Sequence, residues 1–372
     1  MNVIHINSYF ETNLYEEIYS RLRDNAIITN VIIPIRFGDS RYDDKKDKYN
    51  VIECYNKIDR FFLKTKIKKE VKAIKSRFNS ILQNADIFHA HSLYSNGTVT
   101  YELSLIYKKP FVLTIRNSDI NNLAKLYKMH NSYKNLILRS AKSIIFVSKA
   151  GRDKFIKNIR NVMTKEYVVS HSTIIPNGIS NSFFSTNNNE PIIKKISGNP
   201  KLLFVGRNDK NKNVLYVAKS IQKFNLKCKL SVVGRAVNNL LENKLSKYNF
   251  VERIDALPVE KIKIMYYNAD IFVMCSKTET FGLAYIEALS QGTPILYTKN
   301  TGIDGTFPEG KVGFQINIKS KKDFCNKYNY LVDYYEKIQP NCQKESYLFS
   351  WDQIIVKFIE LYAEIISSSK NE

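Results

Sequence analysis

The sequence has no hydrophobic run long enough to cross a membrane, which takes about 18 to 20 consecutive apolar residues in a helix. Its first residues, Met1–Asn7, have a strand pattern and lack the basic lead and cleavage pattern of a signal peptide. Its five cysteines are scattered, and no pair has the spacing of metal ligands or of a redox site. Together these absences predict a cytoplasmic protein with reduced thiols.

Acidic residues are also scarce: 35 Asp and Glu stand against 57 Lys and Arg, and the net charge is +22. Residues 1–185 contain 30 basic and 16 acidic groups, a surplus of 14, whereas residues 186–372 contain 27 and 19, a surplus of 8. Such a surplus attracts nucleic acids, anionic membrane lipids and phosphorylated ligands. The first half is the more basic, so we expect it to meet an anionic partner.

The densest basic segment, residues 60–78, has two interpretations. Its apolar residues recur at helical spacing with lysines between them: Phe62, Ile67, Val71, Ile74 and Phe78. One interpretation is a basic amphipathic helix on a membrane surface. The other is a helix whose apolar stripe packs on a core while its lysines face solvent. The sequence leaves both open.

Strand and helix patterns alternate along the chain, which predicts an α/β fold with two doubly wound parallel sheets. The expected strands are Val3–Ile6, Thr29–Pro34, Ile87–Ala90, Phe111–Ile115, Ser143–Val147, Lys201–Val205, Leu230–Val233, Ile271–Met274 and Ile295–Tyr297. The expected helices are Leu14–Arg23, Val99–Tyr107, Leu123–Ser140 and Asn213–Phe224.

A polar segment rich in chain-breaking residues interrupts this alternation. We therefore predict a domain over residues 1–184, a linker over 185–200, a second domain over 201–348 and a C-terminal helical segment over 349–372. In the last segment Ser350 and Gln353 form a capping box before an apolar stripe, so we expect this helix to dock across the first domain. The cleft between two such domains is the default ligand site.

Two carboxylates, Glu279 and Glu287, flank a Thr-Phe-Gly turn and a helix that ends at Gly292 and Pro294. The turn follows the expected strand at Ile271–Met274, and such junctions hold ligands in open α/β sheets. On one straight helix this spacing gives about 12 Å of rise and about 80° of rotation, so an acid and a base acting on one bond are disfavoured. We expect each carboxylate to grip a different part of one ligand through hydroxyls. A surface helix glutamate is the alternative for Glu287.

Arg207 and Lys212 lie on a loop that follows a strand and precedes a helix. Helix N-termini attract anions through free N–H groups and partial positive charge. The planar guanidinium of arginine matches phosphate, and lysine adds a compact cation. The pair is spaced to straddle a diphosphate. A solvent-exposed basic loop is the alternative.

These patterns together resemble a glycosyltransferase of family 4, whose GT-B fold has two Rossmann-like domains facing each other across a cleft. The segments that carry the resemblance are Phe204–Arg207 with Lys212, Glu279–Glu287, Gly292–Pro294, Asp86–Ser92, Phe146–Ser148, Ile175–Gly178 and Phe349–Trp351. The resemblance implies a retaining enzyme that uses a nucleotide-diphosphate sugar and needs no metal or other cofactor. The departing phosphate would assist attack, and the protein would supply positioning and electrostatic stabilisation.

The resemblance also implies roles in the second domain. Arg207 and Lys212 would hold the donor diphosphate and offset charge on the leaving group. Glu279 would bind hydroxyls of the donor sugar, and these three residues would form the catalytic set. Glu287 would bind the ribose hydroxyls. Backbone groups would contact the sugar, the phosphate or the base at Phe281, Gly282, Leu283 and Leu257.

In the first domain the sequence departs from the family pattern, since Arg116-Asn-Ser-Asp119 stands where many members have a histidine. Arg116 would contact the donor sugar or phosphate and Asp119 the acceptor hydroxyl, and both would also be catalytic residues. We also place His91 and Asn117 on the acceptor side.

His89 and His91 share one face of a strand, a spacing that a metal pair would use. No third ligand is apparent in the sequence. We therefore predict no metal site and expect a polar contact or a hydrogen-bonded buried histidine.

The resulting prediction is a hexosyl- or N-acetylhexosaminyltransferase with a nucleotide-sugar donor that is UDP-linked. Its acceptor would be a lipid-linked saccharide or an oligosaccharide in O-antigen, capsule or lipopolysaccharide assembly, met at the inner face of the membrane. One alternative is a nucleotide-sugar epimerase or a soluble-acceptor transferase of the same fold. Another is a basic nucleic-acid-binding protein, which would leave Glu279 and Glu287 without a role.

Overall fold

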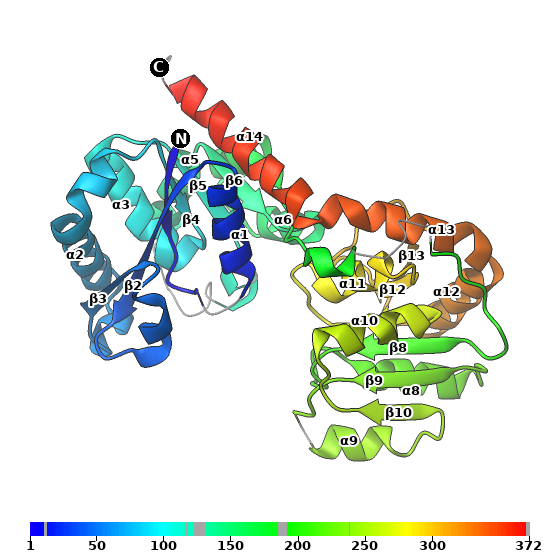
Figure 1. The fold of residues 1–372 in the computed structure, drawn as a ribbon. Coiled ribbons are helices and arrows are strands. Elements are labelled where there is room, and N and C mark those ends of the chain that lie inside the picture. The colour runs from blue at the N-terminus through cyan, green and yellow to red at the C-terminus, as the bar shows by residue number, and fades with distance from the viewer. Residues whose placement is uncertain (11–12, 117, 123–130, 185–191, 238, 370–372) are drawn as a thin grey trace. The chain divides into compact units, whose positions relative to one another are not determined.

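The computed structural model describes residues 1–372 apart from 11–12, 117, 123–130, 185–191, 238 and 370–372, and it divides into two compact units (Figure 1). Unit 1 comprises Met1–Val147, Gly151–Ile175 and Ile355–Glu372, and unit 2 comprises Ser148–Ala150 and Pro176–Ile354. Unit 2 begins at Pro176, ahead of the segment expected as a linker. Part of that expected linker, residues 185–191, lies outside the described residues.

Unit 1 is built on a seven-stranded parallel sheet with the order β3-β2-β1-β4-β5-β6-β7. Its strands are β1 (Asn2–Ile6), β2 (Ile28–Arg36), β3 (Asn50–Tyr55), β4 (Ile87–Ala90), β5 (Phe111–Ile115), β6 (Ser143–Phe146) and β7 (Ser172–Ile174). The five strands expected in this half are confirmed, and the two edge strands, β3 and β7, are additions.

The helices of unit 1 cover both faces of this sheet. They are α1 (Asn13–Asp24), α2 (Leu63–Gln83), α3 (Thr98–Tyr107), α5 (Asn131–Ser140), α6 (Lys149–Lys157), α7 (Val162–Ser170) and most of α14 (Trp351–Ser369). Side chains of β1 alternate between the faces: Ile4 and Ile6 enter a core shared with α2, α3 and α5, while His5 packs against Tyr19 of α1. Of the helix expected over Leu123–Ser140, only the part from residue 131 lies within the described residues.

Helix α2 decides between the two interpretations of the basic segment. Ile67, Ile74 and Phe78 are buried, and Ile74 and Phe78 belong to the core of unit 1. Lys66 is buried as well, beside Glu70 with an Nζ–Oε1 distance of 3.3 Å. From Ile67 onward the apolar stripe therefore packs on the protein's own core, whereas Phe62 at the helix entrance is exposed. A membrane helix that uses the whole stripe is excluded.

Unit 2 is built on a six-stranded parallel sheet with the order β10-β9-β8-β11-β12-β13. Its strands are β8 (Lys201–Val205), β9 (Lys229–Val233), β10 (Val251–Ile254), β11 (Ile271–Met274), β12 (Ile295–Thr298) and β13 (Gly313–Ile316). Its helices are α8 (Val214–Lys223), α9 (Asn239–Leu245), α10 (Val259–Asn268), α11 (Leu283–Ser290), α12 (Lys321–Asp333) and α13 (Tyr335–Ser346). The predicted α/β class with two parallel sheets is confirmed.

Helix α14 begins in unit 2 and continues in unit 1. One of the two hydrogen bonds of the expected capping box is present, since the N–H of Gln353 donates to Ser350 Oγ over 3.4 Å. The N–H of Ser350 donates to the Tyr347 carbonyl instead. Further along, the hydroxyl of Tyr362 lies 2.6 Å from His89 Nδ1 on the sheet of unit 1. The apolar stripe of this helix is buried, as its periodicity predicts: Trp351, Ile354, Ile355, Phe358, Tyr362 and Ile365.

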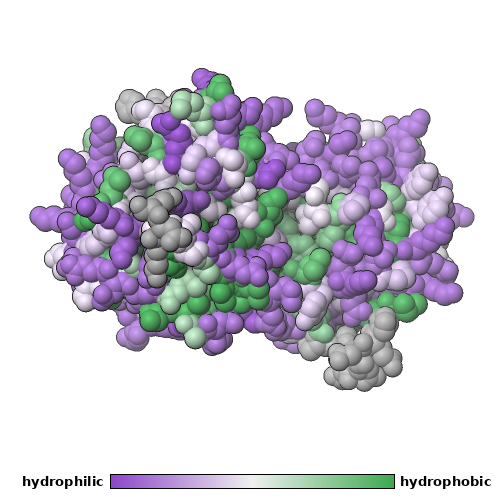
Figure 2. Space-filling view, turned by 90° about the horizontal axis from the view of Figure 1, so that it is seen from above, coloured by the Kyte–Doolittle hydropathy of each residue, from purple (hydrophilic) through white to green (hydrophobic). Residues whose placement is uncertain are grey.

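The surface is mixed in polarity. The face seen in Figure 2 is mostly hydrophilic, with smaller groups of apolar residues between the polar ones. Among the residues that the structure describes, no helix combines the length and the apolar character needed to cross a bilayer.

Candidate functional site

Loops of unit 2 gather at the carboxyl ends of its strands. Because the sheet is parallel, the segments after β8, β9, β11 and β12 all leave it at one edge, where open α/β sheets bind ligands. Two of these loops touch closely: a Cβ on Gly234 would lie 2.2 Å from the carbonyl oxygen of Gly206. Gly234 also has φ +135°, so only glycine fits there.

Lys212 and Glu279 meet at this edge. Their Nζ and Oε2 atoms are 2.5 Å apart, and both side chains are largely shielded from solvent. The loop that holds Lys212 is shaped by Asp209, whose Oδ1 accepts the N–H groups of Asn211 and Lys212 over 2.9 and 2.8 Å. This side-chain-to-backbone turn directs Lys212 toward the loop after β11, which contains Glu279. A predicted cation and a predicted carboxylate, 67 residues apart, thus form one ion pair.

Arg207 is placed differently from Lys212. Its side chain is 72% exposed, and its Nη2 lies 3.5 Å from Asp209 Oδ2. An exposed guanidinium with one weak ionic contact is available to an anion at the same strand edge. The predicted diphosphate contact of Arg207 stays a prediction.

Two residues that the sequence did not assign to the site, Asn211 and Thr301, fix the backbone around Glu279. Asn211 donates to the carbonyl of Thr278 over 2.9 Å and accepts from its N–H over 3.1 Å. Thr301 Oγ1 accepts the N–H of Glu279 over 2.7 Å. Gly302 donates its own N–H to the Glu279 carbonyl over 3.2 Å. Loops after β8 and β12 therefore hold the Glu279 loop from two sides.

Helix α11 begins immediately after the turn, as predicted, with Glu279 ahead of it and Glu287 in its second turn. Gly282 has φ +88°, and a Cβ there would lie 2.6 Å from the ring of Tyr285. The first N–H groups of a helix have no partners within it, so those near Gly282 and Leu283 are suited to an anion or a hydroxyl. Phe281 itself is buried, with its ring centroid 5.5 Å from that of Phe349.

Glu287 is held by a neighbour that the sequence did not reveal. The buried hydroxyl of Tyr266, on α10, donates to Glu287 Oε2 over 3.0 Å. Burial raises the pKa of Glu287 above its usual value, and the hydrogen bond from Tyr266 partly offsets this. Glu287 is therefore an oriented, half-buried carboxylate, which disfavours the surface-glutamate alternative.

Leu257 lies on the segment between β10 and α10, at the same edge of the sheet. Its side chain is half-buried. Pro258 follows and caps α10 without a side-chain hydrogen bond. The predicted backbone contact of Leu257 with a base stays a prediction.

On unit 1 the predicted acceptor-side residue Asp119 is already bonded to protein groups. Asp119 is buried, and its two oxygens accept the N–H groups of Leu93 and Arg116 over 3.1 and 2.9 Å. Burial raises the pKa of Asp119 to about 6, although these backbone hydrogen bonds act in the opposite direction. The guanidinium carbon of Arg116 lies 5.3 Å from the ring centroid of Tyr15. Asn117 lies outside the described residues.

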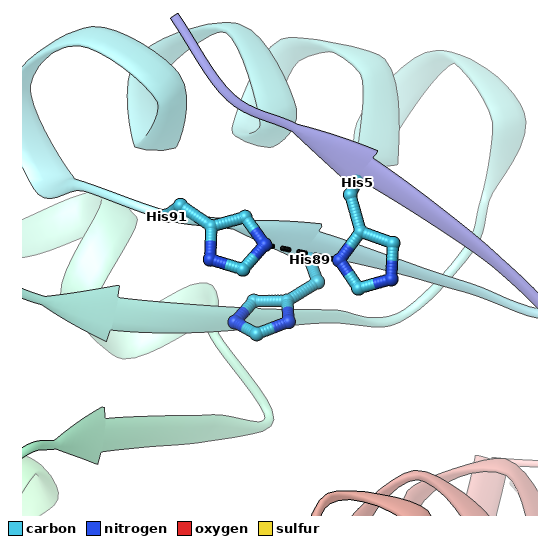
Figure 3. A group of neighbouring side chains, drawn as sticks. All are labelled: His5, His89 and His91. Atoms are coloured by element: carbon cyan, nitrogen blue, oxygen red, sulfur yellow. Dashed lines mark hydrogen bonds between the residues drawn. The ribbon is translucent and has the colours of Figure 1, made fainter. Parts of the chain in front are cut away.

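Three histidines of unit 1 lie close together, as Figure 3 shows. His5 on β1 pairs in register with His89 on β4, and His5 Nδ1 lies 3.0 Å from His91 Nε2. All three are buried, and a ligand nitrogen from each lies within 4.8 Å of the others. The expectation that His89 and His91 have no third partner is therefore wrong: His5, which is 86 residues from His91, completes the group.

Each ring of this histidine group makes at least one hydrogen bond, although His5 Nε2 and His91 Nδ1 are buried without a partner. His89 contacts Tyr362 through Nδ1 over 2.6 Å and Thr114 through Nε2 over 2.7 Å. Burial lowers the pKa of His5 to about 3 and those of the other two well below their usual range, so all three rings are neutral at pH 7. A metal would take from His89 one of its two hydrogen bonds. The arrangement favours a network that fastens α14 to the sheet.

Two family models match the chain, one on each side of residue 184. The model described as Glycosyltransferase Family 4 matches residues 32–183, and the model described as Glycosyl transferases group 1 matches residues 185–347. Together they cover most of both units.

Individual relatives are similar to most of the chain. An uncharacterised glycosyltransferase of Methanocaldococcus jannaschii is 23% identical over 288 residues, which is 76% of each chain. An uncharacterised 41.2 kDa protein in the cps region of Klebsiella pneumoniae is 23% identical over 331 residues, 86% of this chain and 87% of that one. The solved Anabaena HepE protein, in complex with UDP and glucose, has a TM-score of 0.69 at 17% identity over 98% of this chain and 100% of that one. This last likeness shows the fold.

Proposed function

The chain belongs to glycosyltransferase family 4 and has the GT-B fold, and from this premise we propose that it transfers a sugar, with retention of configuration, from a UDP-sugar to a saccharide acceptor. The observation that carries the proposal is the Lys212–Glu279 ion pair beside the first turn of α11, at the carboxyl edge of the unit 2 sheet. A cation, a carboxylate and free helix N–H groups are what a sugar diphosphate needs.

The chemistry follows from the charges. As the bond between sugar and diphosphate breaks, negative charge grows on the phosphate, and Lys212 with Arg207 offsets it. Bound phosphate competes with Glu279 for Lys212, so Glu279 becomes free to accept a hydroxyl of the donor sugar. The acceptor hydroxyl attacks the anomeric carbon on the side of the departing phosphate, which takes up its proton. The protein supplies positioning and electrostatic stabilisation in this step.

The nucleotide is held further along α11. Glu287 accepts the ribose hydroxyls, and its orientation is kept by Tyr266. Leu257 contacts the base through its backbone. The Anabaena structure of the same fold contains UDP, which supports a uridine nucleotide for this chain.

For the acceptor we propose a lipid-linked saccharide, with a hexose or an N-acetylhexosamine transferred during assembly of a surface polysaccharide at the inner face of the membrane. Two observations support this. Residues 1–185 are the more basic half of the chain, which suits an anionic carrier or lipid surface. The Klebsiella pneumoniae relative is a protein in a cps region.

A panel of UDP-, GDP- and ADP-sugars, scored by nucleotide release with and without bacterial lipid extract, tests the proposal. We expect release from one UDP-sugar that rises when lipid extract is added and disappears in Glu287→Ala. Release of nucleotide from no donor would contradict the proposal. Conversion of the donor without any acceptor would instead identify an epimerase of the same fold.

A further inference from the structure

Three large apolar side chains face solvent where the short helix η2 (Ile58–Phe61) leads into α2. Ile58, Phe61 and Phe62 are 69%, 84% and 60% exposed, and Phe61 is the most exposed large hydrophobic side chain among the described residues. Leaving these three side chains in water costs about 25 cal/mol for each Å² of apolar surface. A cluster of this kind marks an interaction surface more often than a single exposed residue does.

A stripe of lysines runs along α2 from this apolar cluster. Lys64, Lys68, Lys72 and Lys75 are all exposed, and their spacing places them on one side of the helix. The other two lysines of the helix have protein partners. Lys66 lies beside Glu70, and Lys69 Nζ forms an ion pair with Asp59 Oδ2 over 2.8 Å.

The stripe bears no negative charge of its own. Glu70 is the only acidic residue in the sequence of α2, and it is buried. The helix therefore presents an apolar tip and, along one side, a stripe of four exposed lysines. This is the composition of a segment that binds at the interface of an anionic bilayer.

We propose that this docking surface, made of Ile58, Phe61, Phe62 and the stripe Lys64, Lys68, Lys72 and Lys75, binds an anionic lipid bilayer. The rings enter the boundary between headgroups and acyl chains, and the lysines meet lipid phosphates. The inference rests on the proposed function, because a lipid-linked acceptor lies in such a bilayer. It differs from the amphipathic-stripe interpretation, since Ile67 and Ile74 remain in the core.

A bilayer fits this surface better than a nucleic acid does. Bases stack on aromatic faces, and Ile58 offers none, whereas acyl chains accept Ile58 and both rings equally. The cations also lie along one line of the helix, which matches a flat surface of phosphates.

Cosedimentation with vesicles of equimolar phosphatidylcholine and phosphatidylglycerol tests the proposal, with phosphatidylcholine vesicles as reference. We expect Phe61→Ser with Phe62→Ser to lower binding about tenfold, because bound area sets the strength of interfacial binding. Changing the four lysines of the stripe to Gln lowers binding by more, on the order of fivefold for each lysine. Added salt weakens the binding of wild type and of the Ser variant, and has little effect on the Gln variant.

Matched controls separate this surface from overall charge and stickiness. Changing Lys219, Lys227, Lys229 and Lys244, all exposed in unit 2, to Gln removes the same charge and leaves vesicle binding unchanged. The double variant Leu240→Ser with Tyr330→Ser removes apolar side chains that are 70% and 55% exposed in unit 2. It should also leave vesicle binding unchanged. Thermal unfolding and UDP binding stay as in wild type in every variant, so a failure of the docking surface is distinguishable from a failure of the proposed function.

Several outcomes would overturn the proposal. The proposal fails if the Ser variant and the Gln variant bind vesicles as strongly as wild type does. It also fails if the unit 2 control variants lose as much vesicle binding as these two variants do. Self-association of wild type that the Ser variant abolishes, without vesicle binding, would assign the surface to a second copy. A gel shift of RNA or DNA lost in the Gln variant, again without vesicle binding, would assign it to nucleic acid.

Discussion

The carboxyl edges of the two sheets use their polar residues in opposite ways. In unit 2 the predicted groups lie on loops that other loops hold in place, and a cation and a carboxylate meet in the Lys212–Glu279 pair. In unit 1 the corresponding groups are buried and bonded to their own protein: Asp119 to backbone N–H groups, and His91 to His5. The same kind of sheet therefore carries a partly exposed set of polar loops in one unit and a buried polar network in the other.

From this difference we predict which motif residues act directly on a ligand. A carboxylate such as Glu287 that keeps one oxygen on Tyr266 retains acceptor capacity for a ligand. A carboxylate such as Asp119 with an N–H group on each oxygen acts first on the loop that it holds. We expect substitutions in unit 2 to change turnover, and those in unit 1 to change stability or loop structure first.

The largest effect should follow from breaking the ion pair of unit 2. Lys212→Ala removes the cation that faces the leaving phosphate, and we expect turnover to fall by roughly 100- to 1000-fold, as for other lost electrostatic donors. The assay is nucleotide release at saturating donor. Lys210→Ala, an exposed lysine on the same loop, is the matched control and should retain near-normal turnover. Equal activity in both variants would remove Lys212 from the site.

A second large effect is expected at Glu287. Glu287→Gln keeps the shape but loses the charge that strengthens hydrogen bonds from ribose hydroxyls, so we expect the donor KM to rise by about tenfold or more. Steady-state kinetics with varied donor measures this. A KM like that of wild type would mean that Glu287 does not touch the nucleotide.

The matching test in unit 1 concerns stability. Asp119→Ala leaves the buried N–H groups of Leu93 and Arg116 without an acceptor, and we expect the free energy of unfolding to fall by about 2–4 kcal/mol. Denaturant unfolding measures this, with the exposed Asp153→Ala as control. An undiminished stability together with a raised KM for the acceptor would instead support the predicted contact of Asp119 with the acceptor hydroxyl.

A smaller effect is expected for Tyr266→Phe. The variant loses one hydrogen bond to Glu287, worth about 1 kcal/mol, so the donor KM should rise about fivefold while kcat stays near that of wild type. A fall in kcat with unchanged KM would place Tyr266 outside the orientation of the nucleotide.

The smallest effect is one of pH. Because burial raises the pKa of Glu287, its carboxylate becomes protonated at a higher pH than an exposed glutamate as the solution is acidified. The donor KM of wild type should therefore begin to rise at a higher pH than the titration of an ordinary glutamate, and Glu287→Gln should lose this dependence. If the donor KM of both proteins rises over the same acidic pH range, another group causes the pH dependence.

Sequence patterns report on residues that are close together along the chain, and this decides which features they predict. Gly282, Gly292 and Pro294 punctuate the chain locally, so the limits of α11 and the separate places of Glu279 and Glu287 follow from spacing. The partners do not, because Lys212 is 67 residues from Glu279, and Tyr266 is 21 residues from Glu287. Only the strand order brings such segments together.

Helix α2 is a second example of this limit. An apolar stripe at a spacing of three and four residues is identical in a core helix and in a membrane-surface helix. Burial of Ile74 settles that choice, and the exposed Phe61 at the helix entrance is a feature that no periodicity contains. His5 escapes sequence analysis for the same reason, because its partner His89 becomes its neighbour only through pairing of β1 with β4.

The central claim is that the strand-edge loops of unit 2 hold a nucleotide sugar through Lys212, Glu279 and Glu287. Isothermal titration of the full chain with UDP, GDP and ADP tests it most directly. We expect wild type to bind UDP, Glu287→Gln to bind it at least about tenfold more weakly, and Lys210→Ala to bind it as wild type does. Wild type that binds none of the three nucleotides, or a Glu287→Gln variant that binds UDP as tightly as wild type, would contradict the claim.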